Sequence, residues 1–236
     1  MIKTIFFLMV ACTPPANAHV NIDLSPEFDD SYTAEIDPYA SRGLKVSYLS
    51  SVAIQTFEGG IPLGAGSGNY FKLGKHRFII TAAHVVEGEV EVSILEKGYS
   101  MVDAKVVYLD SNSDIAVLVP VERLKYTKAI PFRRDINNQM GEKVYHCGHP
   151  AREGWHISEG ILTGTHVDTL LVNTFAWPGS SGSVLFDESG RVLGILSAIR
   201  VDGPFGLPSL VEHIVLAGNI KMLDQQHLKD ALRSNE

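Results

Sequence analysis

Short apolar runs separated by Gly, Asn, Asp and Ser dominate the chain from about residue 47 onwards. Runs of this length between turn-forming residues are typical of β-strands. They predict two sets of six strands, separated by a charged, proline-containing stretch at residues 122–138. The first set is expected at residues 51–57, 62–72, 77–81, 89–95, 101–109 and 115–119, and the second at 142–147, 155–163, 168–173, 183–187, 191–201 and 205–210.

Two sets of six strands predict an all-β protein built from two six-stranded antiparallel β-barrels, because closing each sheet removes its exposed edges. We place the first barrel at residues 46–125, a linker at 126–138 and the second barrel at 139–211. In the remaining residues, 212–236, apolar positions recur at helical spacing, which predicts a C-terminal helix packed on the second barrel. These positions are Met222, Leu223, Leu228 and Leu232.

The N-terminus has the pattern of a signal peptide over residues 1–18: Lys3, a short apolar run and then Ala16-Asn17-Ala18. The protein is therefore expected to be exported. A second interpretation stays open, because the residues before Cys12 resemble a lipobox, and a lipid on Cys12 would attach the protein to a membrane. Residues 19–45 are polar and weakly periodic, and are interpreted as an N-terminal arm.

Charge and cysteine content bear on the possible partners of the protein and on how its fold is stabilised. The formal net charge is −7, and no basic cluster stands out in the sequence beyond Arg133-Arg134, which disfavours nucleic acid as a partner. Cys12 and Cys147 are the only cysteines. Removal of residues 1–18 would leave Cys147 without an intramolecular disulfide partner, so the fold must depend on its core.

Three short motifs supply the groups for acyl transfer, in the order His84, Asp114, Ser181. A serine hydroxyl needs a base to take its proton, and an imidazole suits that role near pH 7. A carboxylate behind the imidazole holds its tautomer and stabilises its charged form. The nearest alternative acid is Asp110, and the alternative nucleophiles are Ser180 and Ser183.

Gly179 precedes the candidate nucleophile and allows a turn that brings its own N–H and that of Ser181 to one point, as an oxyanion hole. This chemistry requires neither a metal nor an organic cofactor. The His and Cys residues at 146, 147, 149 and 156 offer metal-ligand chemistry. Strand alternation sends His146 and Cys147 to opposite faces, so no metal site is predicted.

The motifs together resemble the trypsin-like, chymotrypsin-fold serine peptidases, and are most similar to the bacterial and phage HtrA-like branch. The resemblance implies a double barrel with the triad in the cleft. It also implies that Ser197-Ala198-Ile199 pairs with an extended protein or peptide substrate. By position, Phe175 and Ala176 line the primary specificity pocket together with Ala198, which favours small or medium apolar substrate side chains.

The chain departs from this family's pattern in places. Ser180 stands where animal enzymes carry an Asp, and Ser183 where many relatives have the second glycine of Gly-Gly-Pro. HtrA-like proteins usually add a peptide-binding PDZ domain, for which we expect no room here. The expected function is that of a secreted serine endopeptidase. The alternatives are a catalytically inactive peptide-binding protein of the same fold and, less favoured, an α/β-hydrolase, which would need alternating helices before Ser181 and the order Ser, acid, His.

Overall fold

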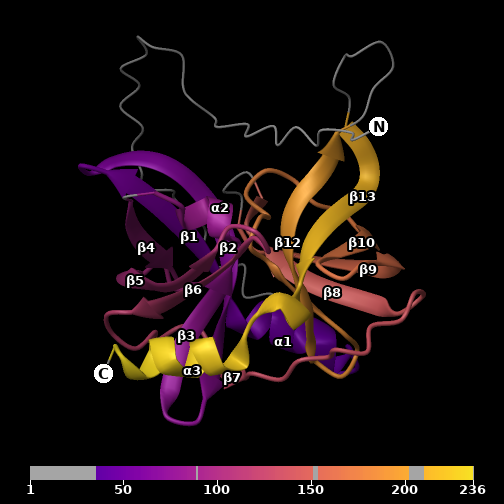
Figure 1. Ribbon diagram of the computed structural model, residues 1–236, viewed down its shortest axis with the longest axis horizontal. Coiled ribbons are helices and arrows are strands. Elements are labelled where there is room, and N and C mark those ends of the chain that lie inside the picture. Colours follow the sequence, from indigo (N-terminus) through magenta and orange to yellow (C-terminus); the bar gives the residue numbers. More distant parts are fainter. Residues whose placement is uncertain (1–35, 89, 151–153, 202–209, 236) are drawn as a thin grey trace. The chain divides into compact units, whose positions relative to one another are not determined.

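The computed structural model describes residues 36–88, 90–150, 154–201 and 210–235 (Figure 1). The predicted signal peptide, Cys12 and most of the predicted arm lie outside the described residues. Of the unit that ends at Ala40, only a short turn is described, in which the Ala40 N–H donates to the carbonyl oxygen of Asp37. The helices and strands of the described residues all belong to the second unit, Ser41–Glu236.

The first six strands form a closed antiparallel barrel, as predicted. They follow one another around it in the order β1-β4-β5-β6-β3-β2, and pairing of β1 with β2 closes the ring. A short seventh strand adds to β2 in parallel. The strands are β1 (Ser51–Glu58), β2 (Ile61–Leu73), β3 (His76–Thr81), β4 (Glu91–Leu95), β5 (Met101–Asp110), β6 (Ile115–Pro120) and β7 (Ile130–Pro131).

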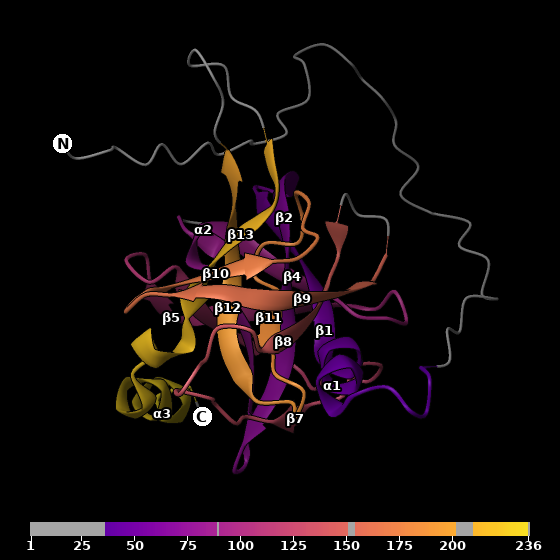
Figure 2. The ribbon, with the colours of Figure 1, turned by 90° about the vertical axis from the view of Figure 1, so that its right-hand side faces the viewer.

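The other six strands close into a second antiparallel barrel in the order β10-β13-β12-β11-β8-β9, which confirms the predicted double-barrel fold. Figure 1 shows the two barrels next to each other, and Figure 2 shows the second barrel in front of the first. The strands are β8 (Lys143–Gly148), β9 (His156–Thr165), β10 (Thr169–Asn173), β11 (Val184–Phe186), β12 (Val192–Val201) and β13 (Leu210–Asn219).

The end of the second barrel differs from the prediction. The last strand was expected at residues 205–210, most of which lie outside the described residues. The described strand, β13, occupies Leu210–Asn219, in the segment assigned to a helical tail. The run Ile214-Val215-Leu216 is rich in β-branched residues and pairs on both sides, with β10 and with β12.

The tail becomes helical only after this strand, first as the 3₁₀ turn η3 (Ile220–Met222) and then as α3 (Gln225–Arg233). The expected docking on the second barrel was wrong, because α3 lies against β5 of the first barrel. Its buried residues, Leu228 and Leu232, join the apolar cluster between the barrels. No helix in the described part of the chain is both long and apolar enough to cross a bilayer.

Helix α1 (Arg42–Ser50) has no counterpart in the sequence-based prediction and spans the boundary placed at residue 45. Its buried face consists of the small residues Gly43, Ser47 and Ser50, so it shows no hydrophobic periodicity. The Ser41 hydroxyl caps its N-terminus by accepting a hydrogen bond from the Leu44 N–H. The small residues let the helix lie close to β8 and β11 of the second barrel.

The apolar cluster between the barrels contains buried residues from both of them. Phe71 and Phe78 from the first barrel stack at 5.9 Å between ring centroids, and Phe186 from the second lies 6.1 Å from Phe71. Beside them, the buried side chain of Asn69 accepts a hydrogen bond from the Val184 N–H and donates to the carbonyl oxygen of Ser47. Apolar packing and directional hydrogen bonds therefore fix the position of one barrel against the other.

Candidate active site

His84 lies on α2 (Ala83–Val86), a single turn that follows β3 directly, and its side chain is 28% exposed. The Asp114 carboxylate faces it from the start of β6. Its Oδ2 lies 2.8 Å from His84 Nδ1, and its Oδ1 accepts the His84 backbone N–H at 2.9 Å. A carboxylate on Nδ1 selects the tautomer protonated there, which leaves the Nε2 lone pair free to act as a base.

A turn between β5 and β6 presents this carboxylate. Asp114 has φ of 54°, in the left-handed region that Asp tolerates better than most residues. Asp110 accepts hydrogen bonds from the Asn112 N–H and from the Ser113 hydroxyl, at 3.0 and 2.6 Å. The alternative acid, Asp110, is therefore occupied in shaping the turn that holds Asp114.

Opposing effects set the charge of Asp114. Burial on its own would raise the pKa of this carboxyl group. Hydrogen bonds from His84 and from the Ser197 hydroxyl, together with attraction to His84, outweigh burial and hold the pKa of Asp114 below its ordinary value. The group is therefore a carboxylate at neutral pH, as the support of an imidazole base requires.

Ser181 lies in a loop of the second barrel, just after a turn over Trp177–Ser180. The Ser180 N–H donates to the Trp177 carbonyl at 2.8 Å, Pro178 stands at the second position, and Gly179 at the third has φ of 100°. These features define a type II turn. Ser180 and Ser183 are buried, whereas Ser181 is partly exposed, so Ser181 is the most accessible of the three candidate hydroxyls.

The backbone N–H groups of Gly179 and Ser181 find no acceptor among the described residues. Both belong to the tightly turned segment that carries the candidate nucleophile. Two such donors next to a partly exposed hydroxyl are able to hold a developing negative charge on oxygen.

Ser197, on β12, connects the nucleophile to the acid. Its carbonyl oxygen accepts the Ser181 hydroxyl at 3.4 Å, and its own hydroxyl donates to Oδ2 of Asp114. No hydrogen bond between Ser181 and the His84 ring is present among the described residues. Sequence reasoning assigned Ser197 to substrate binding and missed this link, because the contact joins residues 83 positions apart.

Ser67, in the middle of β2, holds the nucleophile loop against the first barrel. Its N–H donates to the Ser181 carbonyl and its hydroxyl to the Gly179 carbonyl, both at 2.7 Å. The same hydroxyl accepts the His149 N–H at 2.8 Å, and its carbonyl accepts the Thr81 hydroxyl at 2.7 Å. Sequence reasoning assigned no role to Ser67, which stands in the run Gly66-Ser67-Gly68.

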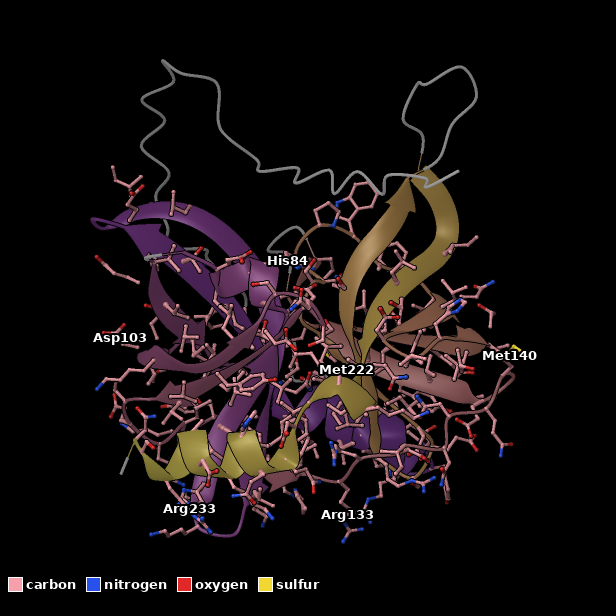
Figure 3. The ribbon with its side chains drawn as sticks, in the orientation of Figure 1. His84, Asp103, Arg133, Met140, Met222 and Arg233 are labelled. Atoms are coloured by element: carbon pink, nitrogen blue, oxygen red, sulfur yellow. The ribbon has the colours of Figure 1, made fainter. Side chains whose placement is uncertain are left out.

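The glycine before Ser67 brings the histidine and serine loops together. A Cβ atom on Gly66 would lie 2.6 Å from Val85 Cγ1 and 3.1 Å from the carbonyl oxygen of Ser181. Val85 follows His84 in the sequence. The segment that carries His84 and the loop that carries Ser181 therefore both pack closely against the backbone of Gly66. Figure 3 shows His84 on the side of the first barrel that faces the second.

The predicted pocket residues lie on the segment after β10. Phe175 is 52% exposed, and Ala176 packs against the core of the second barrel. Ala198 and Ile199 pair with β13 through their backbones. On the other side of β12, pairing with β11 ends at Ile195, and no described strand continues it.

His146 lies beneath this segment and is fully buried. Its Nε2 lies 3.1 Å from the Phe175 carbonyl, so Nε2 carries the proton and donates it. Burial lowers the pKa of His146 to about 4, which keeps the ring neutral near pH 7. Within the described ranges, no three His, Cys, Asp or Glu side chains gather where they could hold a metal ion.

The family described as Trypsin-like peptidase domain matches residues 66–195, which include all three candidate triad residues and more than half of the chain. The chain belongs to the trypsin-like peptidase family. Protease Do-like 1, chloroplastic, from Arabidopsis thaliana is a relative with 30% identity over 154 residues, 59% of this chain and 34% of the relative. A probable periplasmic serine endoprotease DegP-like from Rhizobium meliloti (strain 1021) is 30% identical over 174 residues, 68% of this chain and 34% of the relative.

This trypsin-like chain thus spans about a third of the length of these curated relatives. Among solved structures, the serine endoprotease from Yersinia pestis matches with a TM-score of 0.64 and 21% identity, over 86% of this chain and 70% of that one. The HtrA-type protease AlgW with tripeptide matches with a TM-score of 0.65 and 20% identity, over 82% and 64%. The resemblance to the HtrA-like branch is confirmed.

Substitution Ser67→Ala is expected to slow the reaction of Ser181 with a fluorophosphonate by about tenfold or more. The Gly179 carbonyl and the His149 N–H would lose their partner, which costs about 1–3 kcal/mol and loosens the nucleophile loop. Labelling rate and thermal unfolding measure the two effects. The control is Ser93→Ala, which removes a hydroxyl that binds Asp103 elsewhere in the same barrel and should leave labelling unchanged. Equal labelling rates in both variants would contradict the assignment.

The buried His146 predicts a loss of stability in acid. The unfolded chain protonates this ring below about pH 6.5, whereas the folded chain resists until about pH 4. Stability should therefore fall between these values, by roughly 3 kcal/mol in total, and this contribution should stop falling below about pH 4. Urea unfolding at several pH values should show a shallower dependence in His146→Asn. The control, His156→Asn on the exposed start of β9, should keep the pH dependence of the wild type. If His146→Asn also keeps the wild-type pH dependence, the buried ring is not the neutral group described here.

Proposed function

We propose that this trypsin-like protein is a serine endopeptidase in which Ser181 is the nucleophile, His84 the base and Asp114 the group that orients the base. The observation that carries the proposal is the carboxylate bound to His84 Nδ1, with the nucleophile loop fastened beside it through Ser67. Each residue comes from a different segment of the chain, and both barrels contribute.

In the proposed reaction, Ser181 Oγ attacks the carbonyl carbon of the scissile peptide bond while His84 Nε2 takes the hydroxyl proton. Rotation about the Cα–Cβ bond of Ser181 carries Oγ from the Ser197 carbonyl towards the ring. Hydrogen bonds of this kind are often incomplete without substrate and form in the complex. His84 then gives the proton to the departing amine, and water hydrolyses the acyl-enzyme with the same base.

The tetrahedral intermediate places a negative charge on the former carbonyl oxygen. We assign the N–H groups of Gly179 and Ser181 to this oxygen, because both are without acceptors in the described part of the chain. Loss of one such donor typically lowers kcat by about 10²–10³-fold. The type II turn at Pro178-Gly179 is the backbone feature that supports this arrangement.

The substrate is proposed to be a protein or peptide in extended conformation, paired with the backbone of Ser197-Ala198-Ile199. The side of β12 away from β13 has no strand partner beyond Ile195 in the described residues, so it offers backbone groups to a peptide. Phe175 and Ala176 are proposed to contact the substrate side chain before the cut. The HtrA-type relative whose structure contains a tripeptide is consistent with this mode.

Export is proposed on the basis of the sequence pattern at residues 1–18 and of relatives named as periplasmic endoproteases. Attachment to a membrane depends on whether Cys12 carries a lipid.

An inactive peptide-binding protein is the second candidate for the function. One observation favours it: the Ser181 hydroxyl donates its hydrogen bond to the Ser197 carbonyl rather than to His84.

Substitution Ser181→Ala distinguishes the two candidates. For an endopeptidase, it should abolish both casein hydrolysis and fluorophosphonate labelling, while the melting temperature stays within a few degrees of the wild type, since the hydroxyl has one weak partner. Ser111→Ala, at an exposed hydroxyl bound to Glu87, serves as the control and should keep full activity. A wild-type protein that binds peptides but neither cuts nor labels would establish the inactive alternative.

A peptide library should show cleavage after small or medium apolar residues, since Phe175 and Ala176 bring no charge to the proposed pocket. Mass spectrometry of the products reads the preference directly. Cleavage chiefly after Arg, Lys or Glu would show that other groups determine specificity.

A further inference from the structure

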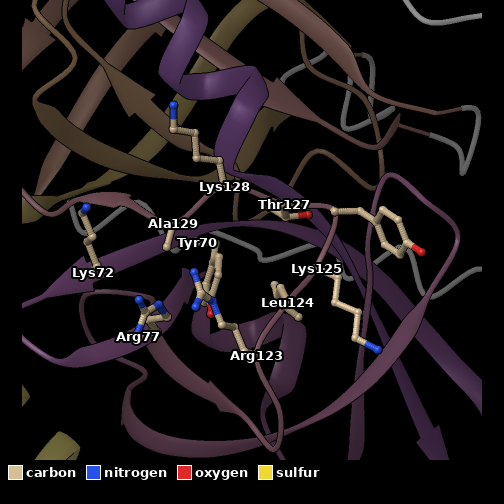
Figure 4. Close-up of a pocket in the computed structure, with 10 residues that line it drawn as sticks. Tyr70, Lys72, Arg77, Arg123, Leu124, Lys125, Thr127, Lys128 and Ala129 are labelled. Atoms are coloured by element: carbon tan, nitrogen blue, oxygen red, sulfur yellow. The ribbon is translucent and has the colours of Figure 1, made fainter.

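A pocket of about 440 Å³ opens on the first barrel, away from the triad (Figure 4). Its walls come from β2, β3 and the segment between β6 and β7. Its charged lining residues are all basic, although the whole chain has a formal charge of −7. The lining residues are Tyr70, Lys72, Arg77, Arg123, Leu124, Lys125, Tyr126, Thr127, Lys128 and Ala129.

The register between β2 and β3 brings two of the basic residues together. Lys72 and Arg77 are direct partners in the antiparallel pair of β2 and β3, so their side chains share a face with that of Tyr70. Directly opposed like charges destabilise a sheet unless an anion compensates them. Arg123 joins them from the facing segment, and Figure 4 shows the guanidinium groups of Arg77 and Arg123 near each other beside Tyr70.

A buried acid holds the facing segment in place. The Glu96 carboxylate, fully buried, accepts the backbone N–H groups of Lys125, Tyr126 and Thr127 at 3.1, 2.7 and 3.0 Å. All of its described hydrogen bonds are to backbone donors, so it fixes the loop rather than pairing with a basic side chain. The pocket wall is therefore built before any ligand arrives.

The basic groups lack partners of their own. In the described ranges, the side chains of Lys72, Arg77, Arg123, Lys125 and Lys128 form no hydrogen bond and no ion pair. Arg77 Nε is buried without an acceptor, and the buried hydroxyl oxygen of Thr127 also has no partner. A buried guanidinium donor without an acceptor is energetically unfavourable. A ligand with acceptor oxygens would remove this cost by accepting hydrogen bonds in the pocket.

We propose that this pocket binds a ligand that carries two or more phosphate groups. Arg77 and Arg123 present forked N–H donors that match phosphate oxygens, and the three lysines among the lining residues add positive charge at the edges of the pocket. A volume of about 440 Å³ beside two arginines exceeds what a single phosphate group fills. The site is separate from the triad, since none of His84, Asp114 and Ser181 lines it.

Titration of the full chain with tripolyphosphate in a calorimeter at low salt tests the proposal. The wild type should bind one equivalent, and R77Q/R123Q should bind at least about tenfold more weakly, as expected for loss of charge-assisted hydrogen bonds. The matched control, K105Q/R133Q, removes the same charge from exposed positions outside the pocket and should bind like the wild type. Equal weakening in both variants, or no binding by the wild type, would overturn the proposal.

Three further experiments test the chemistry of the ligand, its source and the folding of the variant. Citrate should bind at least about tenfold more weakly than tripolyphosphate, and equal affinity would overturn the assignment to phosphate. Co-sedimentation with phosphatidylglycerol vesicles separates a lipid source of phosphate from a soluble one: loss of vesicle binding in R77Q/R123Q would identify the lipid surface. If thermal unfolding shows that this double variant does not fold, R123Q, at an exposed position, must weaken tripolyphosphate binding at least threefold for the proposal to stand.

Discussion

The hydrogen bonds of Ser67 are the constraint on which the candidate site depends. His84 and Asp114 belong to the first barrel and Ser181 to the second, so the candidate site exists only where the barrels meet. The backbone and hydroxyl of Ser67 hold the carbonyl groups of Gly179 and Ser181, while Thr81 ties the same residue to the strand that leads to His84. Ser67 thereby holds the loop that carries Ser181 next to the strand that leads to His84.

The rest of the barrel joint supports this residue. The stripe of Gly43, Ser47 and Ser50 on α1 lets backbone approach backbone, Asn69 links the helix to β11, and stacked phenylalanines fill the space behind. Burial raises the pKa of the Cys147 thiol to about 11, so it stays protonated near neutral pH and unreactive. Packing and hydrogen bonds, rather than covalent links, hold the described barrels in register.

Local patterns in the sequence predicted most of the fold, because strand alternation and turn residues act over a few positions. They predicted eleven of the twelve barrel strands close to their observed positions, the turn around Ser181, and a triad of which the structure brings His84 and Asp114 together. They failed where the determining contact is distant. The buried face of α1 is polar and small, α3 is drawn to the first barrel by an apolar cluster made of both barrels, and Ser197 gains its second role from Asp114. The basic pocket was also invisible, since its cations are spread from residue 72 to residue 128.

The division of the triad between barrels has a consequence for biosynthesis. A chain emerging from the ribosome exposes the imidazole and its carboxylate long before the serine, and β13, which closes the second barrel, follows later still. Until that last strand pairs with β10 and β12, the barrel that carries Ser181 is not closed. Order of synthesis alone thus delays assembly of the candidate site until the second barrel closes.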